Sequence, residues 1–303
     1  MCRLSLYSFV VLLGANINSR ILSTQIKVKG GKVMYFVTSK DGTKIAYDKI
    51  GQGPALILVA GAFSYRKFTQ QVELANLLSE HFTVYNYDRR GRGDSSDTQP
   101  YHVDREIEDL QSLIDEAGGS AYIWGLSSGA VLSLLAAKKM ESITKLALHE
   151  PPFVVKEEDR KAPKDFRSHL TSLISKNNRD EAIKYFMVKG MGAPSLVVSM
   201  MRIMPGVWSK LMAVAHTLPY DAALLDGYMD GKELSTECWS SIQIPTLVLE
   251  GTESPSSLRN SAKALASVLP HSQLVSKKGL GHTKKLHTKK ISHELLTFFT
   301  ENH

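Results

Sequence analysis

The pentapeptide Gly125-Leu126-Ser127-Ser128-Gly129 is the segment whose residue types and spacing point most directly to chemistry. An apolar run at 120–124 precedes it, and a run with helical character at 130–140 follows. Between a strand and a helix, G-x-S-x-G makes a sharp turn that exposes the serine hydroxyl, and its glycines avoid side-chain clashes. We therefore predict that Ser127 is a nucleophile; the alternative is an ordinary Gly-Ser turn before a buried helix.

A serine nucleophile needs a base, and His282 is the candidate. An imidazole must take the hydroxyl proton during attack and later return a proton to the leaving group. His282 follows an expected strand at 272–276 and lies in the loop 279–282, C-terminal to the serine. The other histidines do not combine a strand-end position with that chain order.

The surrounding elements predict an α/β fold. Residues 34–38 and 43–49 flank the turn dipeptide Asp41-Gly42, which indicates a hairpin. Strands and helices then alternate, with strands expected at 55–60, 82–87, 120–124, 143–149, 245–250 and 272–276, and helices at 67–81, 102–117, 130–140, 257–269 and 288–300. Alternating βα units predict a doubly wound, mostly parallel sheet, whose ligand lies at the carboxyl ends of the strands.

One long segment interrupts this alternation. Residues 153–241 are helical in pattern and rich in methionine, and we expect them to form a lid over Ser127. The expected core then comprises 34–152 and 242–303, while 1–33 is interpreted as a leader or an extension outside the fold. Its short apolar stretch, 4–13, resembles a signal peptide and is too short to span a membrane.

The motifs together resemble the α/β-hydrolase superfamily, in the branch of small cofactor-free esterases and haloperoxidase-like enzymes. The resemblance covers about 34–151 and 243–300, and rests on the segments ALILVAGAF, YDRRGRGDS, GLSSG, LALHEPP, PTLVLEG and the dipeptide Gly281-His282. It implies an eight-stranded, mostly parallel sheet with a helical lid. It also implies the chain order serine, acid, histidine, without a metal or an organic cofactor.

The resemblance further implies an oxyanion hole made of two backbone N–H groups. One would come from Ser128, directly after the nucleophile, and the other from Ala62, in the loop after strand 55–60. Relatives usually have His-Gly at the end of that strand, whereas this chain has Ala60-Gly61. Because the donor is a backbone group, the replacement removes an orienting side chain and leaves the donor.

The acid departs from the family pattern. Relatives commonly carry an Asp three residues after the glycine that ends strand 245–250, and here Ser254 occupies that position. A carboxylate is needed to fix the histidine tautomer and to stabilise the imidazolium. We favour Glu150, at the end of strand 143–149, with Glu253 as the alternative and the lack of any acid as a third possibility.

Two further groups of residues have candidate roles. The charged loop 88–94 is interpreted as a salt-bridged turn that holds two strand ends, with electrophilic catalysis by an arginine as the alternative. An apolar substrate pocket is expected under the lid, because methionine and aromatic side chains line adaptable apolar sites. Its candidate residues are Phe63, Phe186, Met191, Met204 and Trp208.

The composition limits the classes of binding partner that we expect. The formal charge is +7, and much of the excess lies in 277–290, which we interpret as a solvated helix face. No aromatic residue interrupts that run, so we expect no nucleic-acid partner. The two cysteines have no metal-ligand spacing. We expect a cytoplasmic protein without stable membrane insertion, or a secreted or tethered one if 1–33 is a leader.

These residues predict a serine hydrolase that cleaves a carboxylic ester of a small apolar molecule through an acyl-enzyme. The same groups could instead perform acyl transfer, C–C bond hydrolysis or cofactor-free haloperoxidase chemistry. From a different class, the chain could be a non-catalytic binder of a small apolar ligand that keeps the hydrolase fold. The departure at Ser254 and the replacement at Ala60 are the features that favour such a binder.

Overall fold

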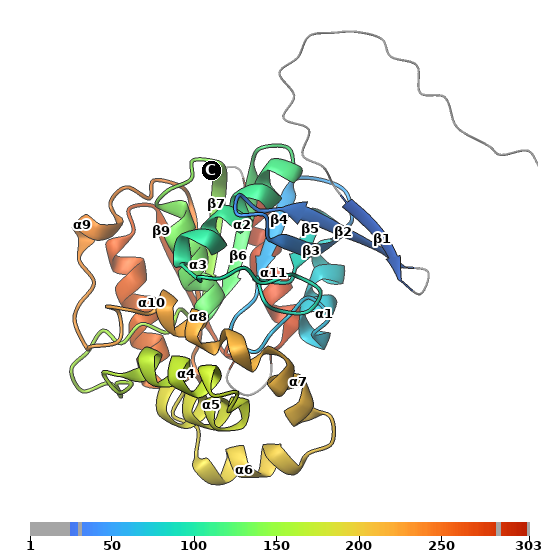
Figure 1. Ribbon diagram of the computed structural model, residues 1–303. Helices are drawn as coiled ribbons and strands as arrows, with labels where there is room; N and C mark the ends of the chain where they lie inside the picture. Colours follow the sequence, from blue (N-terminus) through green and yellow to red (C-terminus); the bar gives the residue numbers. More distant parts are fainter. Residues whose placement is uncertain (1–24, 30–31, 283–285, 302–303) are drawn as a thin grey trace, which may run out of the picture.

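A nine-stranded sheet forms the centre of the molecule, seen in a computed structural model that describes residues 25–29, 32–282 and 286–301 (Figure 1). The strand order is β1-β2-β3-β5-β4-β6-β7-β8-β9. Strands from β5 through β4 to β9 are parallel, whereas β1, β2 and β3 pair antiparallel. The predicted α/β class with a mostly parallel sheet is confirmed. The strands are β1 (Gln25–Lys29), β2 (Lys32–Thr38), β3 (Lys44–Ile50), β4 (Ala55–Val59), β5 (Thr83–Tyr87), β6 (Ala121–Leu126), β7 (Ile143–His149), β8 (Thr246–Gly251) and β9 (Ser272–Lys277).

The first strand departs from the sequence-based expectation. Gln25–Lys29 pairs antiparallel with β2, so the sheet has one strand more than the eight expected. The expected extension 1–33 therefore ends too late, because part of it lies in the sheet. The Lys-Val alternation in this segment lacks the long apolar run that identified the central strands, since an edge strand need not be buried on both faces. Residues 1–24 lie outside the described residues.

Both faces of the sheet are covered by helices. Along β4, Leu56 and Leu58 pack in one hydrophobic cluster, and Ile57 and Val59 pack in the other. This follows from the alternation of side chains across a strand, and it explains the unbroken apolar run in the sequence. Helices α1 (Thr69–Leu78) and α11 (Thr288–Thr300) cover the first face, and α2 (Val103–Glu116), α3 (Ser128–Ala137) and α10 (Ser256–Val268) cover the second.

The inserted segment, which we call the lid, forms a group of short helices that lies below the sheet in the view of Figure 1. Its helices are α4 (Phe166–Ser175), α5 (Arg179–Tyr185), the π-helix η1 (Phe186–Gly190), α6 (Ser195–Ile203), α7 (Val207–Val214), the 3₁₀-helix η2 (Ala215–Thr217), α8 (Leu218–Leu224) and α9 (Thr236–Trp239). The ends of the segment pack elsewhere than expected. Phe153, Leu224 and Trp239 belong to the core cluster of the sheet, so the lid proper is shorter than 153–241.

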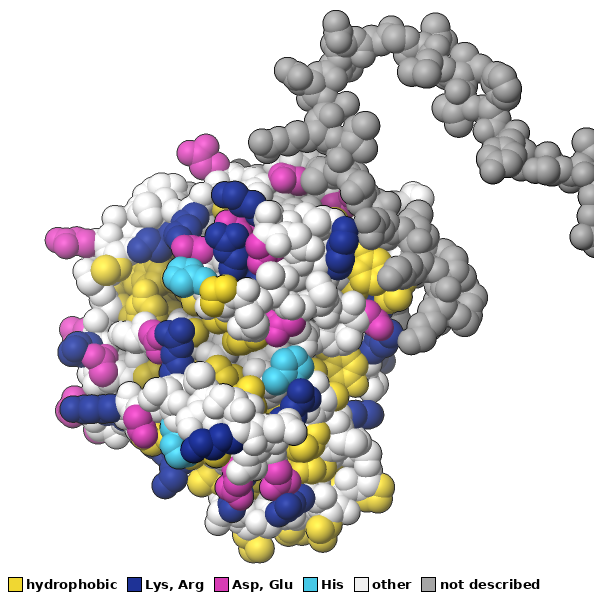
Figure 2. Space-filling view, in the orientation of Figure 1, with side chains coloured by type: hydrophobic (Ala, Val, Ile, Leu, Met, Phe, Trp, Pro, Cys, Tyr) yellow, Lys and Arg dark blue, Asp and Glu magenta, His cyan; other side chains and the backbone are white. Residues whose placement is uncertain are grey.

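The lid has its own small hydrophobic core and a strongly apolar outer surface. Leu170, Ile183 and Phe186 are buried in its core, whereas Leu196 and Ile203 of α6 are 72% and 81% exposed. Figure 2 shows hydrophobic side chains at the surface of this end of the molecule, at the bottom of the view. Among the described residues no single helix is long and apolar enough to cross a membrane. One bent pair of helices, Ser195–Ile203 with Val207–Leu224, has the required length and composition only when the two are taken together.

The contrast between buried and exposed leucines in the lid is testable. Replacing Leu170, which is fully buried, by alanine leaves a cavity and should lower the free energy of unfolding by about 2–5 kcal/mol. The matched control Leu196→Ala removes the same atoms from an exposed position and should change it by less than about 0.5 kcal/mol. Urea denaturation of both variants measures this, and equal effects would show that the lid core contributes nothing.

Candidate active site

The predicted functional residues follow the carboxyl ends of three parallel strands, at one edge of the sheet. Ser127 follows β6, Glu150 follows β7 and His282 lies in the loop after β9. The register pairs Leu126 of β6 with His149 of β7, and the Ser127 N–H donates to the His149 carbonyl at 2.9 Å. This edge is where ligands bind in sheets of this kind.

Ser127 sits in the strained turn that its motif predicts. Its backbone has φ 54° and ψ −122°, outside the regions that a serine normally adopts, and α3 begins at the next residue. A side chain on Gly125 would lie 2.5 Å from the Gly129 carbonyl oxygen, and one on Gly129 would lie 2.3 Å from that of Val59. Only glycines therefore let the start of α3 pack this closely against β6 and β4.

The loop after β4 lies directly beside the nucleophile. A Cβ added to Gly61 would be 3.1 Å from the Ser127 Cβ. The next residue, Ala62, has no acceptor for its N–H among the residues that the structure describes. Ser128 is the first residue of α3, where an N–H has no partner within the helix. Both predicted oxyanion donors are thus close to Ser127 and available.

Glu150 and His282 form a tight pair. The Nδ1–H of His282 donates to Glu150 Oε2 at 2.5 Å, and the His282 backbone N–H donates to the same oxygen at 3.0 Å. Glu150 is fully buried, and its Oε1 accepts the N–H of Gly251 at 2.9 Å. Burial acts to raise the pKa of Glu150, but the His282 hydrogen bond and the neighbouring histidines outweigh it and lower this pKa to about 2.

The other candidate acid lies elsewhere. The Glu253 side chain is 57% exposed and faces Lys278 at 3.7 Å. Ser254, in the position where relatives carry an Asp, is buried, and its Oγ is in close approach to Gly281. The Ser254 hydroxyl makes no well-formed hydrogen bond among the described residues, yet it contributes to lowering the pKa of Glu150. The carboxylate that contacts His282 is thus that of Glu150, and the residue three positions after Gly251 is a neutral serine.

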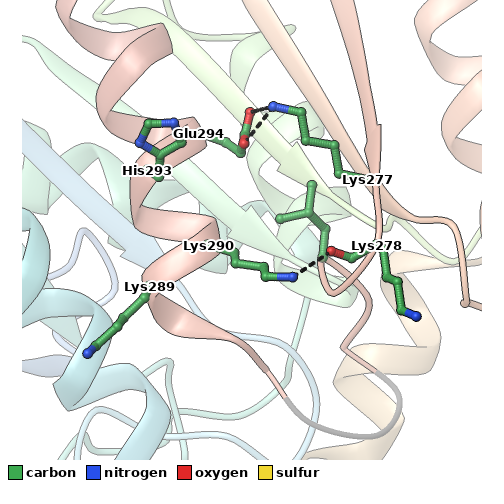
Figure 3. A pocket seen from close by; sticks show the side chains of 7 residues that line it. Lys277, Lys278, Lys289, Lys290, His293 and Glu294 are labelled. Carbon is green, nitrogen blue, oxygen red and sulfur yellow. Dashed lines mark hydrogen bonds and ion pairs between the residues drawn. The ribbon is translucent and has the colours of Figure 1, made fainter.

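The histidine loop is held from two sides. On the inside, the Nε2–H of the buried His149 donates to the Leu280 carbonyl at 2.5 Å. On the outside, Lys290 of α11 donates to the Lys278 carbonyl at 3.0 Å (Figure 3). In the same view, Glu294 of α11 pairs with Lys277 at 2.8 Å. Part of the basic run 277–290 therefore fixes the segment that leads to His282, a role that its charge alone did not indicate.

The arginines of the charged loop 88–94 are buried and paired. Arg89 contacts Glu106, and Arg90 contacts Asp109, each through two hydrogen bonds of 2.7–2.8 Å. The predicted salt-bridged turn is confirmed by these contacts. Sequence reasoning missed Asp221 of the lid. It is fully buried and accepts hydrogen bonds from Arg89 and from Arg92 of the same charged loop. A lone Asp in a helical segment carries no pattern that separates it from a surface residue.

The pocket candidates divide into two groups. Phe63 packs edge-to-face on Phe186 at 5.4 Å between ring centroids, and Trp208 packs against the same lid cluster. Met191 and Met204 are 56% and 51% exposed and belong to none of the hydrophobic clusters. Met191 directly follows η1 and Met204 directly follows α6, so the structure does not place these two side chains with Phe63 and Phe186.

Backbone strain is concentrated around the site. Four described residues other than glycine have positive φ, and three of them are Phe63, Ser127 and Glu150. Strained backbone of this kind persists where the surroundings over-determine it, and it is common at functional sites. In the described part of the chain, no group of three His, Cys, Asp or Glu side chains is arranged to hold a metal ion.

The comparisons with known proteins concern the family and the fold. Residues 56–288 match the alpha/beta hydrolase family. The structure is similar to an alpha/beta hydrolase from Sphaerobacter thermophilus DSM 20745, with 45% identity and a TM-score of 0.79 over 88% of this chain and 100% of that one. It shares its fold with the esterase RhEst1 from Rhodococcus sp. ECU1013, with 20% identity and a TM-score of 0.63 over 88% and 98% of the chains.

A curated relative is the uncharacterized hydrolase YraK of Bacillus subtilis strain 168, 32% identical over 151 residues. The match covers 47% of this chain and 53% of that protein, so the chain spans about half the length of this relative. The family match extends over most of the chain and includes the elbow, Glu150 and His282. The chain therefore belongs to the alpha/beta hydrolase family.

Proposed function

We propose that the protein is a serine hydrolase that cleaves carboxylic esters of small apolar molecules through an acyl-enzyme. The observation that carries the proposal is the buried Glu150–His282 pair at the same sheet edge as the strained Ser127 elbow. Each of these features has a structural cost, in backbone strain or in burial of a charge. Together they supply the nucleophile, the base and the group that orients the base.

The first half-reaction follows from the orientation of His282. Because Nδ1–H donates to the ionised Glu150, the neutral imidazole leaves Nε2 as the acceptor for the Ser127 hydroxyl proton. Ser127 Oγ attacks the ester carbonyl carbon, and the carbonyl oxygen becomes an oxyanion. The N–H groups of Ala62 and Ser128 donate to that oxyanion. The protonated His282 then gives its proton to the departing alcohol, which leaves Ser127 acylated.

The second half-reaction returns the enzyme to its starting state. His282 takes a proton from a water molecule, whose oxygen attacks the acyl carbon. The tetrahedral oxyanion again lies against the N–H groups of Ala62 and Ser128. Its collapse breaks the bond to Ser127 Oγ, which recovers its proton from His282. The negative Glu150 stabilises the imidazolium in both steps without itself taking a proton.

The side chains of the lid favour an apolar substrate. Ala62 and Phe63 pack against the cluster of lid helices that contains Phe186, and Trp208 packs on the same cluster. The acyl or alcohol group of a bound ester would meet hydrocarbon and aromatic surface there, which favours an apolar molecule over a sugar or a phosphate ester. The likeness to the solved esterase from Rhodococcus fits this proposal, and at its level of identity it supports the fold alone.

The nucleophile is tested with a fluorophosphonate probe, which reacts with activated serines, and with p-nitrophenyl esters of varied chain length. The wild type should be labelled at one residue and should hydrolyse the esters, and Ser127→Ala should abolish labelling and lower kcat by at least about a thousandfold. The exposed Ser209→Ala serves as the control and should behave as the wild type. An unlabelled native protein would favour a non-catalytic binder and contradict the proposal.

The acid is tested by comparing two glutamates. Glu150→Gln keeps the side-chain shape but can donate to His282 Nδ1, which holds the imidazole in the wrong tautomer. We expect kcat to fall by about 10²–10⁴-fold with KM little changed. Glu253→Gln, at an exposed position, should retain full activity. The assignment of Glu150 fails if both variants hydrolyse the ester at the wild-type rate.

The buried His149 gives a prediction on pH. Burial lowers its pKa from 6.5 to about 4, so between these pH values the unfolded chain binds a proton that the folded protein does not. Its contribution to stability is intact above pH 6.5 and decreases as the pH falls to 4, by up to about 3 kcal/mol. His149→Gln keeps a donor for the Leu280 carbonyl and removes this titration.

Denaturant titrations of the wild type and His149→Gln at pH 7, 5.5 and 4 measure the effect. The difference in unfolding free energy between the two should move in favour of the variant as the pH falls. Glu150 contributes a separate loss only below about pH 4.5, because its folded pKa is depressed to about 2. Parallel pH curves for the two proteins would mean that His149 titrates as it does in water.

A further inference from the structure

Asp221 of α8 links the lid to the loops around Ser127. Its side chain is fully buried, and both carboxylate oxygens are engaged. Oδ1 accepts hydrogen bonds from Arg89 at 2.8 Å and from the Ser128 hydroxyl at 2.7 Å. Oδ2 accepts from Arg92 at 2.7 Å. One lid carboxylate thus contacts the residue that follows the nucleophile and two arginines from the charged loop.

The two arginines continue from Asp221 to the loop that carries the other oxyanion donor. Arg92 donates to the Gly61 carbonyl at 2.7 Å, and Arg89 donates to the Ala60 carbonyl at 3.3 Å. The Gly61 carbonyl belongs to the same peptide unit as the Ala62 N–H. Because a peptide unit is planar, fixing the direction of its C=O also fixes the direction of its N–H. Arg92 therefore sets where the Ala62 N–H points.

The charges in this cluster balance without solvent. Arg89 also pairs with Glu106 at 2.7 Å, so two arginines face two carboxylates, all of them at most 2% exposed. Burial acts to raise the pKa of Asp221, but Arg92 and Arg89 outweigh it and lower this pKa. Removing one buried partner would leave an uncompensated buried charge, so each contact in this cluster depends on the others.

We propose that Asp221 is a positioning residue that, through Arg92 and Ser128, holds both oxyanion donors in their productive directions. The inference rests on the proposed function, in which the Ala62 and Ser128 N–H groups stabilise the oxyanion. It assigns the lid a second role besides covering the substrate. The oxyanion hole is completed only when α8 is seated on the core, because Asp221 belongs to the lid and its partners belong to the core.

The same loop supplies a matched control. Arg90 and Asp109 are also a buried pair joined by two hydrogen bonds, of 2.7 and 2.8 Å. Arg90 makes its other contacts to Asp41 and to the Arg105 carbonyl, away from the oxyanion loop. If the contacts of Asp221 only stabilised the fold, removing either aspartate would lower the unfolding free energy without a specific fall in kcat. A positioning role predicts that only the variants of the Asp221–Arg92 pair lower kcat.

The test compares Asp221→Asn with Asp109→Asn, and Arg92→Lys with Arg90→Lys. The lysine variants keep the buried positive charge, which preserves folding, but a single ammonium cannot reproduce the fork between Asp221 and the Gly61 carbonyl. With a p-nitrophenyl ester, Asp221→Asn and Arg92→Lys should lower kcat at least tenfold while KM changes less than threefold. Loss of an oxyanion donor lowers kcat by about 10²–10³-fold. The two controls should keep the kcat of the wild type.

A second readout does not depend on activity. Amide hydrogen exchange of the native proteins should become faster in peptides that cover 60–63 and 126–129 for Asp221→Asn and Arg92→Lys, and remain unchanged there for the controls. Equal exchange and equal kcat in both pairs would overturn the inference. If the wild type hydrolyses no ester while exchange still rises selectively, the positioning role stands and the proposed function fails.

Discussion

The hydrogen bond between Glu150 and His282 connects the ends of two strands, β7 and β9, that are not neighbours in the sheet. β8 lies between them, so the histidine loop must pass over the end of β8 to reach the carboxylate. Gly251 and Gly281 make this possible. A side chain on Gly251 would lie 2.2 Å from the Gly281 nitrogen, and one on Gly281 would lie 2.4 Å from Ser254 Oγ. The close approach brings the His282 backbone and ring to the same oxygen of Glu150.

This arrangement explains how the carboxylate of Glu150, the residue after β7, reaches His282. A glutamate is one methylene longer than an aspartate and reaches both the Gly251 N–H and His282 from its strand end. Ser254 fills the position beside it without adding a second negative charge. Two buried carboxylates in contact would raise the pKa of one of them and weaken its hold on the histidine. A neutral residue at position 254 therefore allows Glu150 to remain ionised beside His282.

A second group of buried charged side chains lies close to Ser127. Arg89 and Arg92 reach from the loop after β5 to the oxyanion loop after β4, to Ser128 at the start of α3 and to Asp221 in the lid. Such pairs contribute little net stability compared with apolar packing, but they have few alternative arrangements. The arginines come from the turn 88–94, which contains only charged residues and glycine and so has no hydrophobic side chain with which to pack. The candidate site thus contains a histidine–glutamate pair, and an arginine–aspartate cluster contacts the residue that follows Ser127.

Much of the fold was predictable because it depends on local pattern. The apolar run 55–60, the Asp41-Gly42 turn and the glycine-flanked Ser127 each reflect burial or a backbone requirement that acts within a few residues. Chain order and the position after a strand singled out His282 as the candidate base in the same way. The edge strand Gln25–Lys29 and the outward-facing Met191 and Met204 were not predictable, because neither is distinguished by periodicity.

The sequence by itself determined the class of fold, the nucleophile elbow and a choice between two acids, since these follow from spacing along the chain. Only the tertiary structure distinguishes the surroundings of these two glutamates. Glu150 and Glu253 are equally acidic in sequence, but one is buried beside His282 and the other is exposed beside Lys278. The contacts of Asp221 also come from the tertiary structure alone, because its partners are more than ninety residues away in sequence. Contacts over such separations depend on how the lid packs on the sheet, which no local pattern encodes.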